Sequence, residues 1–261
     1  MSLLPAKVLL LIGLLTVQAS GEPPLKYNWA ELDGQRYQFK LVLHDSFREH
    51  TVAGTVLLRC RPADNGQANV SYEEWAVSDA LVNTGNPFDF VIPETNWEPL
   101  VFFDRKHELS NQPAIVAADG TCPARQGHSL LFLAGTITDW IFEILPPQDA
   151  QEWSASRGDT LLVSWPNGRP NPRKFPCTVD SQYSLGAVTG NSVTTNKLFS
   201  VKSKDVCGGE PRIELSGTQA ITFDKEHGWL DRSEFAGNFF IREEFVQFRW
   251  AVTMSVNRVI Q

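Results

Sequence analysis

The chain has 261 residues, of which 42% are hydrophobic and 20% are charged, and its formal net charge is −7. This composition is typical of a folded globular protein rather than a disordered or fibrous one. An acidic chain without a run of lysine and arginine disfavours nucleic acid and anionic membrane surfaces as partners, because phosphate binding depends on clustered cations.

The first 19 residues have the pattern of a secretory signal peptide. Lys7 provides a positive start, an apolar run follows to residue 17, and small residues flank a cleavage point after Ala19. The run is too short for a membrane span, which needs about 20 apolar residues. We therefore expect an exported protein, periplasmic or extracellular, with no transmembrane span. Loss of Lys7 takes the net charge from −7 to −8.

Residues 36–44, RYQFKLVLH, alternate between apolar and polar side chains, and the β-branched residues 51–60 follow after a short polar loop. Together they predict a hairpin. His44 and His50 would then face each other at the neck of its loop, beside two carboxylates, and such a set could hold zinc or copper. We interpret the stretch HDSFREH as a polar hairpin tip and expect no metal there, because the sequence identifies no ligand from another element.

Residues 129–147, SLLFLAGTITDWIFEILPP, carry apolar residues at helical spacing and end at two prolines. The segment is apolar on nearly all sides, so we expect one buried helix here. Residues 20–261 are expected to form a single β-rich domain. Two halves, split near residues 120–150, are the alternative.

The last third of the chain gives the strongest strand signals. Residues 177–207 read as two strands joined by a hairpin turn at Gly190-Asn191. Residues 212–223, 229–241 and 245–256 continue as an antiparallel meander with one dry face and one wet face. A turn that contains Gly228, which can adopt a positive φ, joins the first two of these strands. The predicted fold is therefore mainly β: a long antiparallel meander forming a curved sheet or half-barrel around one buried apolar helix.

The four cysteines are Cys60, Cys122, Cys177 and Cys207. An even number in an exported protein indicates disulfides. The hairpin brings Cys177 opposite Cys207 at its open end, which predicts that pair and, by elimination, a Cys60–Cys122 pair; buried thiols are the alternative. Asn69 lies in a glycosylation sequon, which has meaning only in a host that glycosylates.

Three stretches carry a resemblance: LKYNWAELDGQRYQFKL, LLFLAGTITDWIFEILPP and IELSGTQAITFDKEHGWL. They resemble secreted β-rich bacterial proteins of unknown function, of a kind met in planctomycetes. The pattern of these proteins is similar to that of lipoprotein-carrier half-barrels, in which a curved sheet cups an apolar helix or ligand. The resemblance implies no catalytic residues.

The sequence contains no G-x-S-x-G elbow and no H-E-x-x-H motif. We expect a non-enzymatic exported protein, without a cofactor, that binds a lipid or other apolar ligand or a protein partner in the cell envelope. The alternatives are a secreted hydrolase acting on glycans or esters and a carbohydrate-binding module. Trp97, Trp153 and Trp165 lie near predicted loops and are the candidates for stacking on a sugar, whereas Trp75 and Trp250 are expected in the core.

Overall fold

A computed structural model describes residues 24–44, 48–83, 114–119, 138–147, 150–163, 173–242 and 247–260. Its main sheet is formed by β1 (Arg36–His44), β2 (Arg48–Pro62), β3 (Ala68–Asn83), β4 (Ala114–Val116), β5 (Glu152–Val163), β6 (Arg173–Thr189), β7 (Ser192–Ser203), β10 (Ile213–Asp224), β11 (Trp229–Arg242) and β12 (Gln247–Arg258). The remaining elements are α1 (Trp29–Leu32), the 3-10 turn η1 (Asp64–Gly66), α2 (Thr138–Ile141), and a small hairpin of β8 (Val206–Cys207) and β9 (Glu210–Pro211). None of the helices in these ranges is long and apolar enough to cross a membrane.

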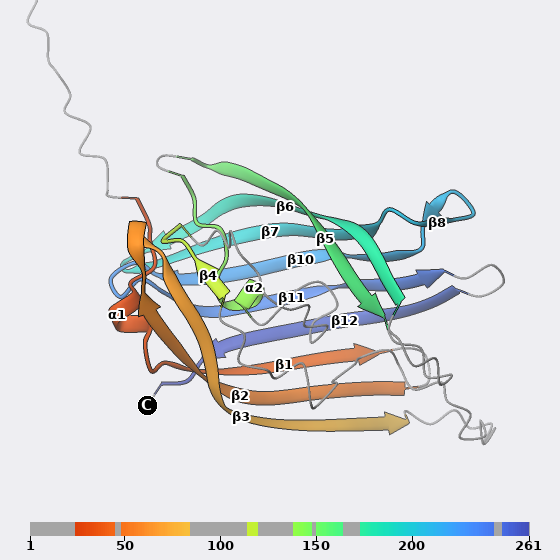
Figure 1. Cartoon of the computed structure of the whole chain (residues 1–261), viewed down its shortest axis with the longest axis horizontal. Helices are drawn as coiled ribbons and strands as arrows, with labels where there is room; N and C mark the ends of the chain where they lie inside the picture. The colour runs from red at the N-terminus through yellow and green to blue at the C-terminus, as the bar shows by residue number, and fades with distance from the viewer. Residues whose placement is uncertain are drawn as a thin grey trace, which may run out of the picture.

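The first and the last of the described strands, β1 and β12, are neighbours in the sheet (Figure 1). The order is β4-β3-β2-β1-β12-β11-β10-β7-β6-β5, and every neighbouring pair is antiparallel. β1 and β12 therefore pair in the middle, with Leu41 opposite Met254. Among the described strands, β4 and β5 are the two edges, and they do not pair with each other, so the sheet is not closed.

One face of the sheet is apolar because apolar and polar residues alternate along each strand, and paired strands place their apolar residues on the same side. In β1 the buried residues are Tyr37, Phe39, Leu41 and Leu43, and in β12 they are Trp250, Val252, Met254 and Val256. Residues directly opposite each other in paired strands lie on the same face, so these side chains form one continuous surface, here called the inner face. The predicted strands, their alternation and the two turns are confirmed: Gly190 and Gly228 adopt positive φ angles of 56° and 69°.

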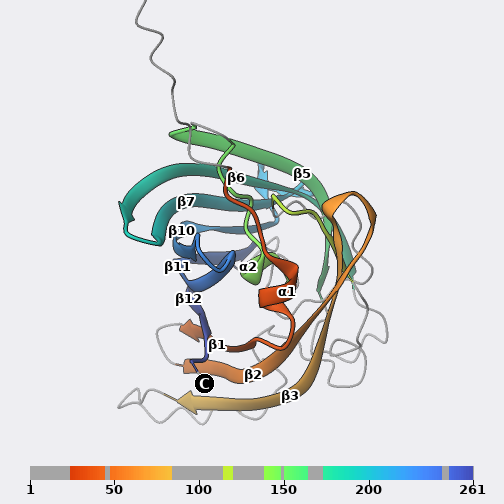
Figure 2. The ribbon, with the colours of Figure 1, turned by 90° about the vertical axis from the view of Figure 1, so that its left-hand side faces the viewer.

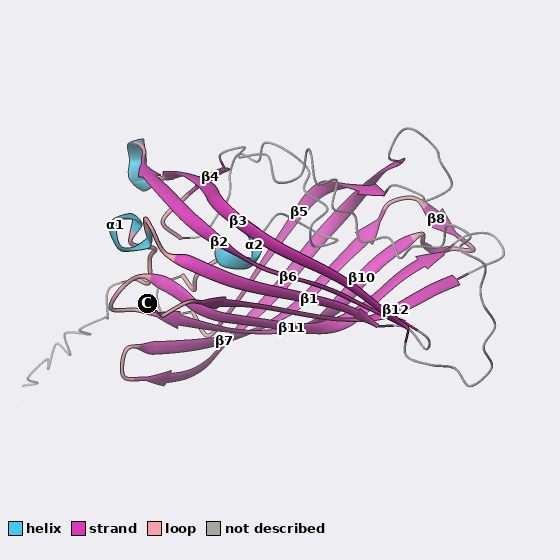
Figure 3. Cartoon of the chain, turned by 90° about the horizontal axis from the view of Figure 1, so that it is seen from below, coloured by secondary structure: helices cyan, strands magenta, loops and turns pink. Residues whose placement is uncertain are grey.

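Three β-bulges occur near one end of the sheet. The register shifts lie between Thr55 and Leu57 of β2, between Thr222 and Phe223 of β10, and between Leu185 and Val188 of β6. A bulge bends its strand and increases the local right-handed twist. Figures 2 and 3 show the result: the sheet is bent into a cup, with α2 on its concave side. The curved sheet predicted from the sequence is therefore confirmed.

The predicted long buried helix is not supported. Within residues 138–147 only α2 is helical, and the chain leaves the helix at Phe142; residues 129–137 lie outside the described part. Burial of this segment is confirmed, since Trp140, Ile141, Phe142 and Leu145 are all buried. The helix ends because Glu143 exchanges backbone hydrogen bonds with the Tyr27 hydroxyl instead of with the preceding turn. Residues 138–147 are called the strap below.

Two glycines make room for the strap. Gly217 of β10 lies opposite Gly237 of β11, and the Phe235 ring covers both. A Cβ atom on Gly217 would lie 2.3 Å from the Ala236 carbonyl oxygen and 2.7 Å from that ring. The Phe235 ring packs edge-on against Trp140 of the strap at 5.5 Å between centroids. The glycine pair therefore fixes where the aromatic anchor of the strap can lie.

We predict that Gly217→Ala destabilises the fold by about 1–3 kcal/mol, the usual cost of overpacking. The matched control is Gly158→Ala in β5, where an added Cβ meets nothing within 4 Å. That control should change the free energy of unfolding by no more than about 0.5 kcal/mol. Urea unfolding of both variants provides the measurement, and equal effects would show that the glycine pair has no packing role.

Candidate binding site on the inner face

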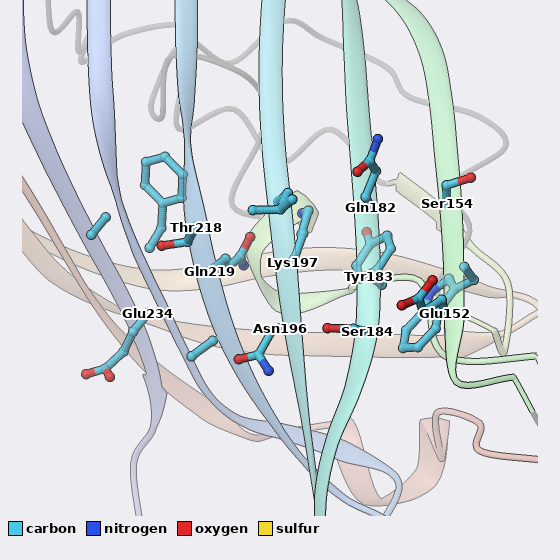
Figure 4. A pocket seen from close by; sticks show the side chains of 15 residues that line it. Glu152, Ser154, Gln182, Tyr183, Ser184, Asn196, Lys197, Thr218, Gln219 and Glu234 are labelled. Atoms are coloured by element: carbon cyan, nitrogen blue, oxygen red, sulfur yellow. The ribbon is translucent and has the colours of Figure 1, made fainter.

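A row of polar side chains crosses the otherwise apolar inner face. Tyr183 of β6 lies opposite Lys197 of β7, which lies opposite Gln219 of β10. All three are buried. Trp153 and Phe235 continue the row on either side. Figure 4 shows the three polar residues on neighbouring strands. Regular antiparallel pairing is therefore enough to bring an ammonium, a phenol and an amide together.

The strap supplies the group that these side chains bind. The Glu143 carboxylate accepts two hydrogen bonds from Lys197 Nζ, at 2.8 and 3.0 Å. Gln219 Nε2 donates to the same carboxylate at 2.6 Å, and the Tyr183 hydroxyl donates at 3.1 Å. Only 4% of the Glu143 side chain and 6% of the Lys197 side chain are exposed. Two opposite charges are thus held out of water, a state that requires close pairing and full hydrogen bonding.

Aromatic rings surround the ammonium group. Lys197 Nζ lies 4.6 Å from the centroid of the Phe199 ring and 5.5 Å from that of Tyr183. Both rings present their faces to a cation that water does not solvate, which adds a cation–π attraction. Burial, and then the negative charge of Glu143, raise the pKa of Tyr183 well above its usual value. The phenol therefore stays protonated and remains a donor.

Three further hydrogen bonds hold the backbone of the strap. Tyr27 accepts from the Glu143 N–H at 2.9 Å, Trp153 Nε1 donates to the Ile144 carbonyl at 3.0 Å, and the Leu145 N–H donates to the Asp119 carbonyl at 2.9 Å. Trp153 also stacks on Tyr183, with centroids 5.0 Å apart and planes at 2°. The strap is therefore fixed by backbone contacts as well as by its charged side chain.

Within the described part of the chain, the amide nitrogen of Gln219 has hydrogen-bond partners, and its amide oxygen does not. Its amide nitrogen donates to Glu143 and to the Ser233 hydroxyl, at 2.6 and 2.7 Å. Its amide oxygen is buried and has no hydrogen-bond partner among the described residues. An unsatisfied buried acceptor is uncommon and calls for an explanation. Glu143 cannot satisfy it, because a carboxylate only accepts hydrogen bonds.

The opposite, outer face of the same strands carries a shallow groove of about 970 Å³ (Figure 4). Exposed side chains of β5, β6, β7, β10 and β11 line it, among them Gln182, Asn196 and Leu198. Glu152 and Glu234 lie at its two ends. They are four strand spacings apart, about 19 Å, whereas the paired carboxylates of glycosidases are about 5–9.5 Å apart. This groove therefore does not bring two carboxylates together for sugar hydrolysis.

The expected pairing of the two hairpin histidines is wrong. His44 lies opposite Glu49, and His50 lies opposite Leu43, so the strand register is one residue away from the predicted one. Because the side-chain period of a strand is two, a shift of one residue separates the partners. Residues 45–47 lie outside the described part. Among the described residues, no group of three or more metal-binding side chains occurs.

The structure does not support the expected disulfides. Cys177 lies opposite Ser203, and the chain then turns into β8, where Cys207 is a free thiol. Cys60 is a buried free thiol, and burial, followed by the charge of Asp33, raises its pKa to about 12. Cys122 lies outside the described residues. The Cys177–Cys207 and Cys60–Cys122 bonds stay predictions from the sequence.

The remaining candidate residues lie in different surroundings. Trp97 and Trp165 lie outside the described residues. Trp153 is used internally, stacked on Tyr183 and bonded to the strap. Trp250 is buried, as expected. Asn69 is exposed on β3.

Sequence reasoning missed the three residues that matter most here, although each left a signal. In β7 the inward positions are Val193, Thr195, Lys197, Phe199 and Val201. A lysine on the dry face of a strand requires a buried partner. Gln219 breaks the dry face of β10 in the same way, and Glu143 is the single charged residue within the apolar residues 140–145.

Comparisons with known proteins are sparse. No family model matches the chain, and no curated protein matches it significantly. A solved structure described as "Lipid-protein interactions in lipovitellin" is similar, with a TM-score of 0.46 and 9% identity over 87% of this chain. The match spans 25% of the lipovitellin chain. At this level of similarity, the two proteins are not shown to share a family.

We predict that Lys197→Met lowers the free energy of unfolding by about 3–5 kcal/mol, because it leaves the Glu143 carboxylate buried without a counter-charge. The double variant Glu143→Gln/Lys197→Met should be distinctly more stable than Lys197→Met alone. It removes both charges and keeps the hydrogen-bonding shape of residue 143. Urea unfolding of wild type, both single variants and the double variant measures the coupling. Additive single effects would contradict a buried ion pair.

A second prediction concerns His227, whose Nδ1 lies 2.9 Å from Asp224 in the turn after β10. The Asp224 hydrogen bond raises the pKa of His227. NMR titration should therefore give a pKa for His227 above about 6.5, the usual value for histidine, and Asp224→Asn should lower this pKa. The pair stabilises the fold below the unfolded-state pKa, and this contribution is lost as pH rises through the folded-state pKa. Titration of wild-type His227 at or below the usual value would contradict the contact.

Proposed function

We propose that this protein is an exported, non-enzymatic binding protein that holds an apolar or amphipathic ligand against the inner face of its sheet. The observation that carries the proposal is the cover of that face. In a β-sandwich, a second sheet buries such a surface. Here the strap and residues 24–32 pack on that face within the described part of the chain, and the strap is held there by side-chain hydrogen bonds and one ion pair rather than by strand pairing.

The chemistry of the inner face suits an acyl chain. Its side chains are aliphatic and aromatic across the central strands, for example Leu43, Val201, Leu215, Phe239 and Val252. Each methylene group transferred from water to such a surface contributes about 0.8 kcal/mol. A ligand would replace the contacts that Trp140, Ile141 and Phe142 of the strap make now. The apolar side chains of the strap and an acyl chain would therefore make the same kind of contact with the inner face.

The alternative functions receive less support from the described residues. The spacing of Glu152 and Glu234 does not suit glycan hydrolysis. Asp224 accepts the Glu226 and His227 backbone N–H groups at 2.9 and 3.0 Å, so its contact with His227 is part of a local turn. Export itself rests on the signal-like residues 1–19, which lie outside the described part. A protein partner in the envelope is the other outcome that a binding experiment can reveal.

The proposal predicts saturable binding of a neutral long-chain probe, hexadecanol, by residues 20–261 after delipidation. Trp140→Ala should raise the affinity about tenfold, because a loss of roughly 1.4 kcal/mol of strap contact corresponds to that factor. Leu198→Ala, at an exposed position of the outer groove, should leave the affinity unchanged. Native mass spectrometry gives the stoichiometry, and titration calorimetry gives the affinity.

Three outcomes would count against the proposal. The first is a protein that binds no hexadecanol in any of the three forms. The second is binding that Leu198→Ala weakens, which would place the ligand in the outer groove. The third is non-saturable uptake that accompanies loss of the folded state in Trp140→Ala, which a thermal melt of each variant detects.

A further inference from the structure

We propose that Tyr183, Lys197 and Gln219 form a binding site for the carboxylate of a long-chain carboxylic acid, and that Glu143 of the strap occupies this site when no ligand is bound. The inference rests on the proposed function and names the class of ligand for the same surface.

The division of groups between sheet and strap is the first argument. Every donor comes from the sheet: the ammonium from β7, the amide from β10 and the phenol from β6. The acceptor alone comes from the strap. Antiparallel pairing holds the three donors in one row, so they keep their arrangement if the strap moves. The sheet therefore contains a complete carboxylate site whose occupant can be exchanged.

The charge balance of the site restricts the occupant. Lys197 is 6% exposed and contacts Glu143 at 2.8 Å. Without an anion it would be a buried cation with no counter-charge, an arrangement that costs several kcal/mol. An alcohol, an ester or a sugar leaves that cation unpaired. A carboxylate replaces Glu143 with the same charge and the same geometry.

The unsatisfied Gln219 oxygen is the second, independent observation. Gln219 is 2% exposed, and its amide oxygen has no partner among the described residues while Glu143 fills the site. The strap thus leaves one acceptor of the site unused. A ligand that brings a hydroxyl or a water molecule beside its carboxylate can supply the missing donor. Glu143, which is fixed by its backbone bonds to Tyr27, does not.

The surroundings of the row indicate an amphiphile rather than a small organic acid. Beyond Lys197, the inward positions of β7 are Phe199 and Val201. The distance along the strand from Lys197 to Ser203 is about 20 Å, and it is apolar on its inner side until Ser203. A head group at Lys197 therefore has a long apolar surface beside it for a chain.

The experiment compares palmitate with hexadecanol, which differ only in the head group, by calorimetry at fixed pH on residues 20–261. Glu143→Ala vacates the site and should bind palmitate about tenfold more tightly than wild type, because the internal competitor is gone. Loss of Glu143 also loosens the strap, so the affinity for hexadecanol should rise too, but much less than that for palmitate, because an alcohol leaves the Lys197 ammonium unpaired. The ratio of the two affinities is therefore the quantity that tests the carboxylate site. Lys197→Met should bind the acid no more tightly than the alcohol. Glu152→Ala removes a carboxylate from the outer groove and should alter neither affinity.

The outcomes separate this inference from the proposed function. If Glu143→Ala raises the affinity for both ligands equally, or for neither, there is no carboxylate site, although an apolar site can still exist. If no variant binds either ligand, the proposed function itself is wrong. If Glu143→Ala does not fold alone, it is refolded with each ligand: recovery with palmitate only supports the inference, and equal recovery or none overturns it. Glu143→Gln, which keeps the shape of the strap, is carried through the same series.

Discussion

The buried contact between Glu143 and Lys197 is the interaction on which the rest of the structure depends. Neither charge can be left alone in the interior, so the strap must lie where its carboxylate reaches β7. Trp140 then packs between Phe199 and Phe235, and Trp153 donates a hydrogen bond to the Ile144 carbonyl. One charged pair thus sets the position of a segment that has little secondary structure of its own.

Buried ion pairs contribute less to stability than their Coulomb energy suggests, because both ions lose their hydration. Their better-attested effect is to select one arrangement among several apolar ones. The inner face offers many equivalent apolar positions, and an apolar strap could slide over them. The row of Tyr183, Lys197 and Gln219 removes that freedom. The same selectivity would apply to a ligand that took the place of Glu143.

Much of the fold could be predicted from the chain, because strand alternation is a local property. The alternation in residues 36–44 and 245–256 gave strands whose buried and exposed positions agree with the structure wherever they are described. The candidate site could not be predicted in the same way. Lys197 and Gln219 are each one polar residue in an apolar strand pattern, and Glu143 lies in a segment whose spacing predicts a helix. Such local patterns do not show which distant side chain pairs with a buried polar group.

The sequence by itself determined the strands, their dry faces and the turns at Gly190 and Gly228, since these depend on neighbours a few residues away. Tertiary structure alone decided three matters: that β12 pairs with β1, that His44 lies opposite Glu49 rather than His50, and that Glu143 meets Lys197. The physical reason is common to all three. A period of two defines the face of each residue but not the partner strand or its register, and those follow from how distant segments bury their apolar surface and their charges together.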